Sequence, residues 1–210
     1  MKRIIFATGN QEKMKEIRQI MADCSVEICS MKEAGIQCDV EENGTTFAEN
    51  AEIKAAAIAQ ILRQNCQMEG KPCQDIVLAD DSGLEIDALN KEPGVYSARY
   101  MGEDTSYHEK NGNLISRLEG VPLEKRSARF VCAIAAVLPD GEFLHTHASI
   151  EGYIGYEEKG ENGFGYDPIF EVPEFGCTTA ELSMEQKNKI SHRGKALAIM
   201  KEELSKKGLV

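Results

Sequence analysis

The sequence predicts an α/β fold built on a mixed β-sheet. Apolar, β-rich segments alternate along the chain with segments whose apolar residues recur at helical spacing. The turn signal Pro-Asp-Gly-Glu at residues 139–142 joins two β-rich segments as a hairpin, so the sheet is not all parallel. With 210 residues, of which 42% are hydrophobic and 28% charged, the composition is that of a globular protein with a sizeable core.

The first third of the chain indicates strand, helix, strand and helix in turn. Residues 3–8 are apolar and β-rich and end in a Thr-Gly-Asn turn. Residues 11–23 place apolar side chains on one helical face, and residues 26–29 form a short second strand. Residues 46–65 carry apolar residues spaced for a broad buried face, and one of the two threonines at the start of this segment could cap the helix.

The next segments lead to an acidic pair. Residues 67–75 are polar and contain glycine and proline, which predicts a loop. Residues 76–79 form an apolar strand that runs into Asp80-Asp81-Ser82-Gly83, and residues 84–89 resemble another strand. The tetrapeptide is therefore expected at a strand end.

The second half of the chain supplies the hairpin and two more helices. Residues 107–118 have moderate helical periodicity, and residues 128–138 and 143–154 are the two strands of the hairpin. Residues 160–167 form a glycine-rich loop, and residues 191–206 form an amphipathic closing helix. We expect one domain over residues 1–210, because no linker or repeat interrupts the chain.

The charge excludes several classes of partner. A net charge of −11, from 24 basic and 35 acidic residues, argues against binding to nucleic acid or to anionic membranes. No apolar run reaches the ~18 residues of a membrane span, and the apolar stretch near residue 1 is too short for a signal peptide. Seven scattered cysteines without a Cys-x-x-Cys pair favour reduced thiols, so we expect a cytoplasmic protein.

The charge is also unevenly distributed along the chain. Residues 1–18 contain five basic and two acidic residues, and residues 185–210 contain seven basic and three acidic ones. The two ends are therefore basic, and the segment between them carries a charge of −18. Such asymmetry often accompanies a site that handles an anion, although a chance excess of surface charge would look the same.

Asp80 and Asp81 are the first candidates for chemistry. Neighbouring residues of a strand point to opposite faces, so at most one of the two readily faces a given cleft. A carboxylate here is a plausible Mg²⁺ ligand, because Mg²⁺ prefers one or two carboxylates together with substrate phosphates. The alternative is an Asx turn that closes a loop.

The segment Thr8-Gly9-Asn10-Gln11-Glu12-Lys13 could hold phosphate oxygens. It is not a P-loop, but it offers a hydroxyl, an ammonium group and the outward-pointing amides of a helix N-terminus. Turns of this composition are common, which is the alternative. Lys54 stands among alanines that leave it room to reach a cleft, although it could be a plain surface lysine. Glu41 and Glu42 alone would suit a solvated turn.

Two later segments could contact a ligand. Phe164 and Tyr166 lie among glycines, so an accessible ring could stack on a base, unless the turn packs Phe164 inward. Ser191 is a fair N-cap for the last helix. His192 and Arg193 in the first turn of that helix oppose its dipole, which indicates an anion or acceptor nearby.

Six motifs in order along the chain resemble the inosine/xanthosine triphosphate pyrophosphatase family, the Ham1-like hydrolases of non-canonical purine nucleotides. The motifs are Thr8-Gly9-Asn10-x-x-Lys13, Glu41-Glu42-x-Gly44-x-Thr46-Phe47-x-Glu49-Asn50-Ala51, Asp80-Asp81-Ser82-Gly83-Leu84, Pro93-Gly94-Val95-Tyr96-Ser97-Ala98-Arg99, Gly163-Phe164-Gly165-Tyr166-Asp167-Pro168, and Lys187 with Ser191-His192-Arg193.

The resemblance implies an elongated fold of two lobes with a central cleft, usually as a homodimer. It implies Mg²⁺-dependent hydrolysis of ITP, dITP and XTP to the monophosphate and pyrophosphate. Asp81 would be the catalytic carboxylate, and Glu41 and Asp81 would bind the metal. The remaining residues would bind substrate: Thr8, Gly9, Asn10, Gln11, Glu12, Lys13, Lys54, Ser82, Phe164, Gly165, Tyr166, Asp167, Lys187, His192 and Arg193.

Two other functions remain open on the sequence. One is a related pyrophosphatase with a different base preference. The other is a nucleotide-binding sensor without catalysis, although a binder has no need for metal-binding carboxylates beside a cluster of lysines. Detection of released pyrophosphate would separate an enzyme from a sensor.

Overall fold

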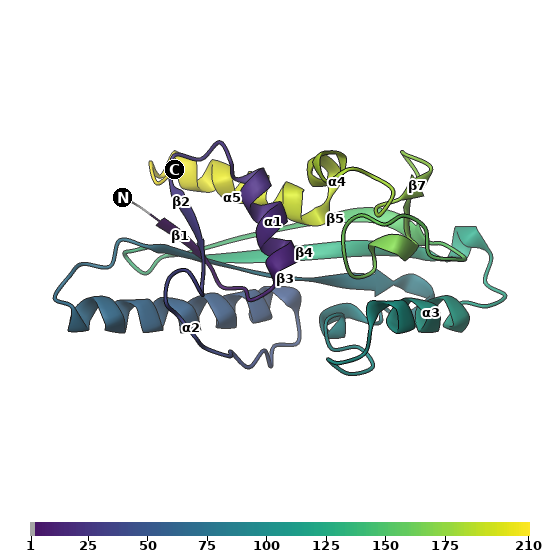
Figure 1. Cartoon of the computed structure of the whole chain (residues 1–210), viewed down its shortest axis with the longest axis horizontal. Coiled ribbons are helices and arrows are strands. Elements are labelled where there is room, and N and C mark those ends of the chain that lie inside the picture. Colours follow the sequence, from purple (N-terminus) through teal and green to yellow (C-terminus); the bar gives the residue numbers. More distant parts are fainter. Residues whose placement is uncertain (1–2) are drawn as a thin grey trace. The chain divides into compact units, whose positions relative to one another are not determined.

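The computed structural model describes residues 3–210 and has the predicted α/β architecture with a mixed sheet (Figure 1). The strand order is β2-β1-β3-β4-β5-β6-β7. The strands are β1 (Arg3–Phe6), β2 (Glu27–Ser30), β3 (Ile76–Ile86), β4 (Ser127–Val137), β5 (Phe143–Ile154), β6 (Phe170–Val172) and β7 (Cys177–Thr178). The helices are α1 (Gln11–Ile20), α2 (Phe47–Met68), α3 (Tyr107–Arg117), α4 (Met184–Ile190) and α5 (His192–Lys206).

Parallel and antiparallel pairs share this sheet. β1 pairs in parallel with both β2 and β3, so Ile5 lies opposite Cys29 on one side and Val77 on the other. β6 pairs antiparallel with β5 and with β7. The predicted hairpin turn is present, because the amide of Leu138 donates to the carbonyl of Glu142 just before β5 begins. The mixed character of the sheet is therefore confirmed.

The chain divides into two compact units. The first comprises residues 3–81, 132–148 and 195–210, and the second comprises residues 82–131 and 149–194. The chain passes from one unit to the other within β3, β4, β5 and the first turn of α5. Each unit has a hydrophobic core of its own. The central cleft that the resemblance implies stays a prediction.

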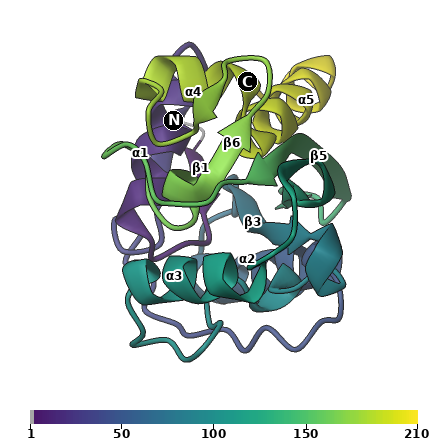
Figure 2. The same ribbon diagram turned by 90° about the vertical axis from the view of Figure 1, so that its right-hand side faces the viewer.

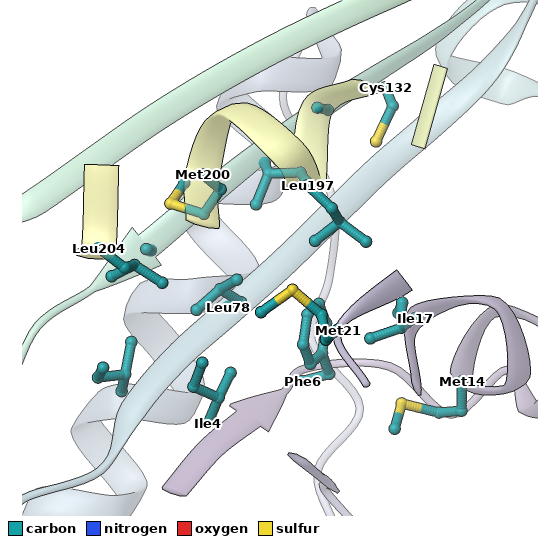
Figure 3. Packing of buried hydrophobic residues seen from close by; sticks show 14 of the residues in the cluster. Ile4, Phe6, Met14, Ile17, Met21, Leu78, Cys132, Leu197, Met200 and Leu204 are labelled. Atoms are coloured by element: carbon teal, nitrogen blue, oxygen red, sulfur yellow. The ribbon is translucent and has the colours of Figure 1, made fainter. Parts of the chain in front are cut away.

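The first unit buries both faces of its part of the sheet. The side chains of β3 alternate between the faces, as the period of a strand requires. Ile76 and Leu78 pack on one face with α1 and α5, as Figure 3 shows for Leu78, Ile17 and Leu197. Val77 and Ala79 pack on the other face with Ala51, Ala55 and Ile58 of α2. This alternation decides where the two aspartates that follow will point.

The second unit packs α3 on its own core. Leu114 of α3 is fully buried in a cluster with Leu84, Phe130 and Phe170. Figure 2 shows α3 and β6, two elements of this unit. Two of its aromatic rings are in contact, because the ring centroids of Phe130 and Phe170 lie 4.5 Å apart.

The structure differs from the sequence prediction at two places that bear on the site. β3 is one continuous strand through Asp80-Asp81-Ser82-Gly83, where a strand end had been expected. The pairing with β1 ends at Leu78, yet this segment stays extended within the sheet despite the low β-propensity of Asp, Ser and Gly. In addition, α4 and the short strands β6 and β7 lie where no regular element had been predicted. In the described part of the chain, no helix is long and apolar enough to cross a membrane.

Candidate active site

The segment that leads into α1 is an ordered turn. The side-chain oxygen of Asn10 accepts hydrogen bonds from the amides of Glu12 (2.9 Å) and Lys13 (3.1 Å) and so caps the helix. The amide of Asn10 in turn donates to the Thr8 hydroxyl (3.2 Å). Two of the amides expected to point outward are thus used inside the turn. The side chain of Lys13 is the part of this segment that reaches the neighbouring strand.

Asp80 and Asp81 are both buried and serve opposite faces of β3. Asp80 continues the face that packs on α1, and it forms an ion pair of 3.1 Å with Lys13. Its side chain is only 1% exposed. Asp80 therefore holds Lys13 in place, which fits the expectation that one aspartate of the pair serves structure.

Asp81 continues the opposite face, toward α2. Its Oδ2 accepts a hydrogen bond of 3.1 Å from the amide nitrogen of Asn50. Burial raises the pKa of Asp81 to about 6, although the nearby charge of Lys13 and the Asn50 hydrogen bond lower it. A buried carboxylate beside cations is the kind of group that can take a proton from water near neutral pH.

A second lysine and a second acid surround Asp81. Lys54 on α2 forms an ion pair of 2.6 Å with Glu42, and only 15% of the Lys54 side chain is exposed, so it is not a plain surface lysine. The charge of Lys54 favours the ionised form of Asp81, and that of Glu42 opposes it. Glu41, the predicted metal ligand, is exposed, and Glu42 is an acid with an electrostatic effect on Asp81.

This donor set fits a magnesium ion. The charge of Glu42 raises the pKa of Asp81, and a divalent cation relieves such repulsion. Mg²⁺ commonly binds one or two protein carboxylates and completes its shell with water and phosphate oxygens. Asp81 and Glu42 match this pattern. Within residues 3–210 no cluster of three or more acidic, histidine or cysteine side chains offers a metal site made by protein alone.

In the second unit, Asp167 holds the glycine-rich loop together. Its Oδ2 accepts hydrogen bonds from the ammonium group of Lys187 (2.6 Å) and from the amide of Phe164 (2.8 Å). Its Oδ1 accepts one from the hydroxyl of Thr179 (2.8 Å). A Cβ at Gly163, whose φ is +72°, would lie 2.2 Å from Asp167. Asp167 is therefore a structural anchor for the loop, and Gly163 permits it.

The loop presents Phe164 beside two cations. The ring of Phe164 is half-buried, and Lys187 Nζ lies 5.0 Å from its centroid. The guanidinium carbon of Arg193 lies 5.7 Å from the same centroid. A half-open aromatic ring beside fixed donors is suited to stacking against a purine and bonding to its edge. Tyr166, in contrast, is buried and donates from its hydroxyl to the carbonyl of Ser97 (2.7 Å), so it supports the loop from inside.

The start of α5 also lies in this unit. The Ser191 hydroxyl accepts a hydrogen bond of 3.0 Å from the amide of Gly194, which confirms Ser191 as a cap. Arg193 donates to the hydroxyl of Ser82 (2.9 Å), and the ring of His192 stacks on Phe130 at 4.9 Å. His192 and Arg193 are both buried, so two cation-forming side chains occupy an interior position at a helix start.

The predicted site residues thus form two groups, one in each unit. Lys13, Lys54 and Asp81 lie together in the first unit, and Ser82, Phe164, Asp167, Lys187 and Arg193 lie together in the second. Gln11 and Glu12 are exposed, and Glu12 pairs with Lys15 at 2.7 Å. The carbonyl of Gly165 accepts a 3.3 Å hydrogen bond from Asn111, so it braces the loop.

Asn50, Glu42 and Thr179 were not among the predicted site residues. Asn50 and Thr179 bond to residues that are distant in sequence, 31 and 12 positions away. Glu42 is one of two adjacent acids and pairs with Lys54. No local pattern therefore singled them out. The one available signal was the presence of Glu42 and Asn50 in the second motif.

Known proteins are similar to this chain over nearly its whole length. The dITP/XTP pyrophosphatase of Caldanaerobacter subterraneus subsp. tengcongensis is 47% identical over 99% of this chain and 98% of its own. That of Clostridium perfringens is 45% identical over 97% of this chain and 98% of its own. The Ham1 protein of Staphylococcus aureus has a similar structure, with a TM-score of 0.82 and 40% identity over 98% of this chain and 99% of its own.

The HAM1 protein of Coxiella burnetii is equally similar in structure, with a TM-score of 0.82 and 39% identity over 98% of this chain and 100% of its own. Residues 4–203 match the Ham1 family as a whole. The match includes both groups of site residues described above. The chain belongs to the Ham1 family.

Proposed function

We propose that this protein hydrolyses the non-canonical purine nucleotides dITP, ITP and XTP to the nucleoside monophosphate and pyrophosphate. The buried Asp81, with Lys13 and Lys54 in electrostatic reach, is the observation that carries the proposal. The relatives that are 45–47% identical are dITP/XTP pyrophosphatases, which supports the same substrate class here. Removal of these nucleotides would cleanse the pool from which nucleic acids are made.

The proposed cofactor is Mg²⁺, held by Asp81 and Glu42. We choose Glu42 over the Glu41 of the sequence prediction because the charge of Glu42 acts on Asp81 and Glu41 is exposed. When bound, the ion would neutralise phosphate charge and lower the pKa of bound water. A net charge of −11 repels a triphosphate, and a cation that accompanies the substrate would reduce this repulsion.

The residues of the first unit would carry out the hydrolysis. Asp81 would orient the attacking water and accept its proton. Lys13, which is held by Asp80, and Lys54 would offset the negative charge that grows on the leaving pyrophosphate. No covalent intermediate is needed, because water is the nucleophile. Asp81 would thus act on the attacking water, and Lys13 and Lys54 on the leaving group, which explains why both lysines lie near this carboxylate.

The residues of the second unit would recognise the base. Phe164 would stack on the purine, and donors of His192, Arg193 or Lys187 would suit the carbonyl at position 6 of hypoxanthine and xanthine. Adenine carries an amino donor at that position and would leave such a donor without an acceptor. The hydrogen bonds to Asp167 described above come from its own loop, from Lys187 and from Thr179. We therefore propose that Asp167 supports the loop that carries Phe164 and does not itself bind the base.

A homodimer and a cytoplasmic location complete the proposal, on the basis of the family resemblance and of the seven free cysteines. Light scattering on the purified protein tests the dimer. A mass of one chain, 23.2 kDa, would exclude it.

The substrate proposal is tested with ITP, dITP, XTP, GTP and ATP in the presence of Mg²⁺, with pyrophosphate and phosphate measured separately. We expect pyrophosphate from the first three and much slower turnover of GTP and ATP. Equal rates on all five nucleotides would contradict the substrate class. Release of phosphate instead of pyrophosphate would contradict the reaction, and no release at all would favour a nucleotide sensor.

A further inference from the structure

We propose that Asn50 is a positioning residue that fixes the acidic segment 41–44 and Asp81 relative to each other. This inference rests on the proposed function, since it concerns the carboxylates that we assign to the metal and to the attacking water. Asn50 itself would not touch the reacting atoms, and it would act through Asp81 and the segment 41–44. Asn50 lies at the start of α2 and is completely buried, with 0% exposure.

The side chain of Asn50 bonds in two directions at once. Its carbonyl oxygen accepts a hydrogen bond of 2.8 Å from the amide of Gly44. Its amide nitrogen donates to Asp81 Oδ2 at 3.1 Å. An asparagine amide satisfies both partners in one orientation only, because a flipped group would turn its oxygen toward a carboxylate and its NH₂ toward an N–H. The two partners are thereby tied to one rigid planar group.

Gly44 makes this close approach possible. A Cβ added at Gly44 would lie 2.7 Å from the Asn50 oxygen and 3.0 Å from the Asn50 backbone nitrogen, where no side chain fits. Glu42 is two residues before Gly44, so the anchor acts at short chain distance from the acid that pairs with Lys54. A segment that would otherwise be a solvated turn is thus fixed beside β3.

The helix itself fixes Asn50. Thr46 and Glu49 form a capping box that starts α2 at a defined residue, so the first turn is ordered. Ala51 and Ala55 on the same helix are fully buried against β3. Asparagine is a weak helix former and its buried amide needs partners, so the two hydrogen bonds compensate an otherwise unfavourable choice of residue. Together, these contacts hold Glu42 and Asp81 in fixed positions relative to each other.

Three variants test the proposal. Asn50→Asp keeps the acceptor for Gly44 but replaces the donor to Asp81 with a second carboxylate. The double variant Asn50→Asp/Asp81→Asn exchanges the two groups and so restores a hydrogen bond between the positions. Asn65→Asp makes the same chemical change on α2, 15 residues further along, at a half-buried position away from the site. It is the matched control.

The first readout is thermal stability without metal, which does not depend on catalysis. Asn50→Asp should lower the melting temperature, and adding Asp81→Asn should recover most of the loss, because the exchanged pair again has one donor and one acceptor. Asn65→Asp should stay near wild type. If adding Asp81→Asn to Asn50→Asp raises the melting temperature by no more than Asp81→Asn alone raises that of the wild type, the coupling is overturned. The double variant also keeps the test decisive if Asn50→Asp alone does not fold.

The second readout separates positioning from simple destabilisation. In the folded Asn50→Asp protein we expect kcat for ITP to fall about 100-fold, as small misplacements of reacting groups do, while KM changes by less than about threefold. The double variant should remain inactive although it is stable.

The outcomes distinguish this inference from the proposed function. Wild-type protein without pyrophosphatase activity, but with the expected stability coupling, would refute the function and leave the tie between Asn50 and Asp81 intact. An active wild type together with a normal kcat in folded Asn50→Asp would refute the positioning role and leave the function standing.

Discussion

The burial of Asp81 is the feature on which the chemistry depends. An isolated carboxylate is unfavourable in the protein interior, and two lysines and the Asn50 amide compensate only part of this effect, because the pKa of Asp81 remains raised to about 6. Asp80, its neighbour, is equally buried but is paired directly with Lys13. The alternation of a strand thus gives two adjacent aspartates different environments and different roles.

The raised pKa predicts a pH-dependent stability of the metal-free protein. The folded state holds a proton on Asp81 up to about pH 6, whereas the unfolded chain loses it near the ordinary pKa of about 3.9. Ionisation of Asp81 therefore lowers stability as pH rises from about 4 to 6, and the loss persists above pH 6. Asp81→Asn should raise the melting temperature at pH 7.5 in EDTA.

The difference between Asp81→Asn and wild type should shrink below pH 6 and vanish below about pH 4. Thermal melts of both proteins over this range, without metal, provide the measurement. A constant difference at all pH values would show that Asp81 does not ionise in the way described.

Glu41 and Glu42 should differ in their importance. Glu42 is within electrostatic reach of Asp81 and is paired with Lys54, whereas Glu41 is exposed. We expect Glu42→Gln to raise the Mg²⁺ concentration for half-maximal activity by 10-fold or more, as loss of a metal carboxylate or of its supporting shell does, and Glu41→Gln to leave it nearly unchanged (about twofold at most). Magnesium titrations of the two variants make the comparison. A larger effect at Glu41 would return the metal role to that residue.

Among the helices, α2 supplies most of the side chains that surround Asp81 in the first unit. Asn50 and Lys54 are four residues apart and so lie on one face of the helix, where they contact Asp81 and Glu42. The capping box at Thr46 fixes the first turn, from which this face begins. The position of the helix start therefore controls the position of both side chains.

Loss of the Thr46 cap should affect both stability and activity. Thr46→Ala removes the hydroxyl that accepts from the Glu49 amide (3.1 Å), and it should lower the free energy of unfolding by about 1 kcal/mol. Because Gly44 and Asn50 flank this turn, kcat should also fall. Urea unfolding and steady-state kinetics measure the two effects.

Ser106→Ala is the control for this variant, because Ser106 forms the equivalent capping box at α3. It should lose similar stability and keep its kcat. Equal losses of kcat in the two variants would mean that the turn before α2 has no special part in catalysis.

The sequence predicts the longer helices and the hairpin because their apolar residues repeat over many positions. The strand over residues 143–154 is confirmed, and of the two threonines expected as possible caps, Thr45 and Thr46, the cap is Thr46. It does not predict α4, β6 or β7, since two to seven residues are too few to show a period. The sequence prediction also ends the strand at Asp80-Asp81-Ser82-Gly83, whereas β3 continues through these residues. The neighbouring strands of the sheet come from distant segments, so no local pattern shows this continuation.

The same limit applies to the site. Motifs locate Lys13, Asp81 and Phe164, since adjacent residues carry the pattern. They do not show which of two neighbouring glutamates acts on Asp81, nor that Asn50 bonds to a residue 31 positions away. Such contacts depend on tertiary packing and are absent from any local window of sequence.

Across the whole molecule, the basic ends contribute less to the site than their charge indicates. Near the C-terminal end, Lys201 pairs with Asp23 and Lys207 pairs with Glu142 at 2.8 Å, so these lysines balance acids on the surface. Lys187 and Arg193 are buried beside Phe164 instead. Few cations therefore serve each group of site residues, and an acidic protein can still handle a highly charged anion.

The most direct test of the role given to Asp81 is the rate of pyrophosphate release from ITP by Asp81→Asn, at saturating substrate and Mg²⁺. The protein should remain folded by circular dichroism, because the introduced amide keeps a carbonyl oxygen that can accept from Asn50. We predict a kcat lower by roughly 10²- to 10⁴-fold, the usual contribution of a positioned acid or base. A kcat within a few-fold of wild type would contradict the assignment of Asp81 as the catalytic carboxylate.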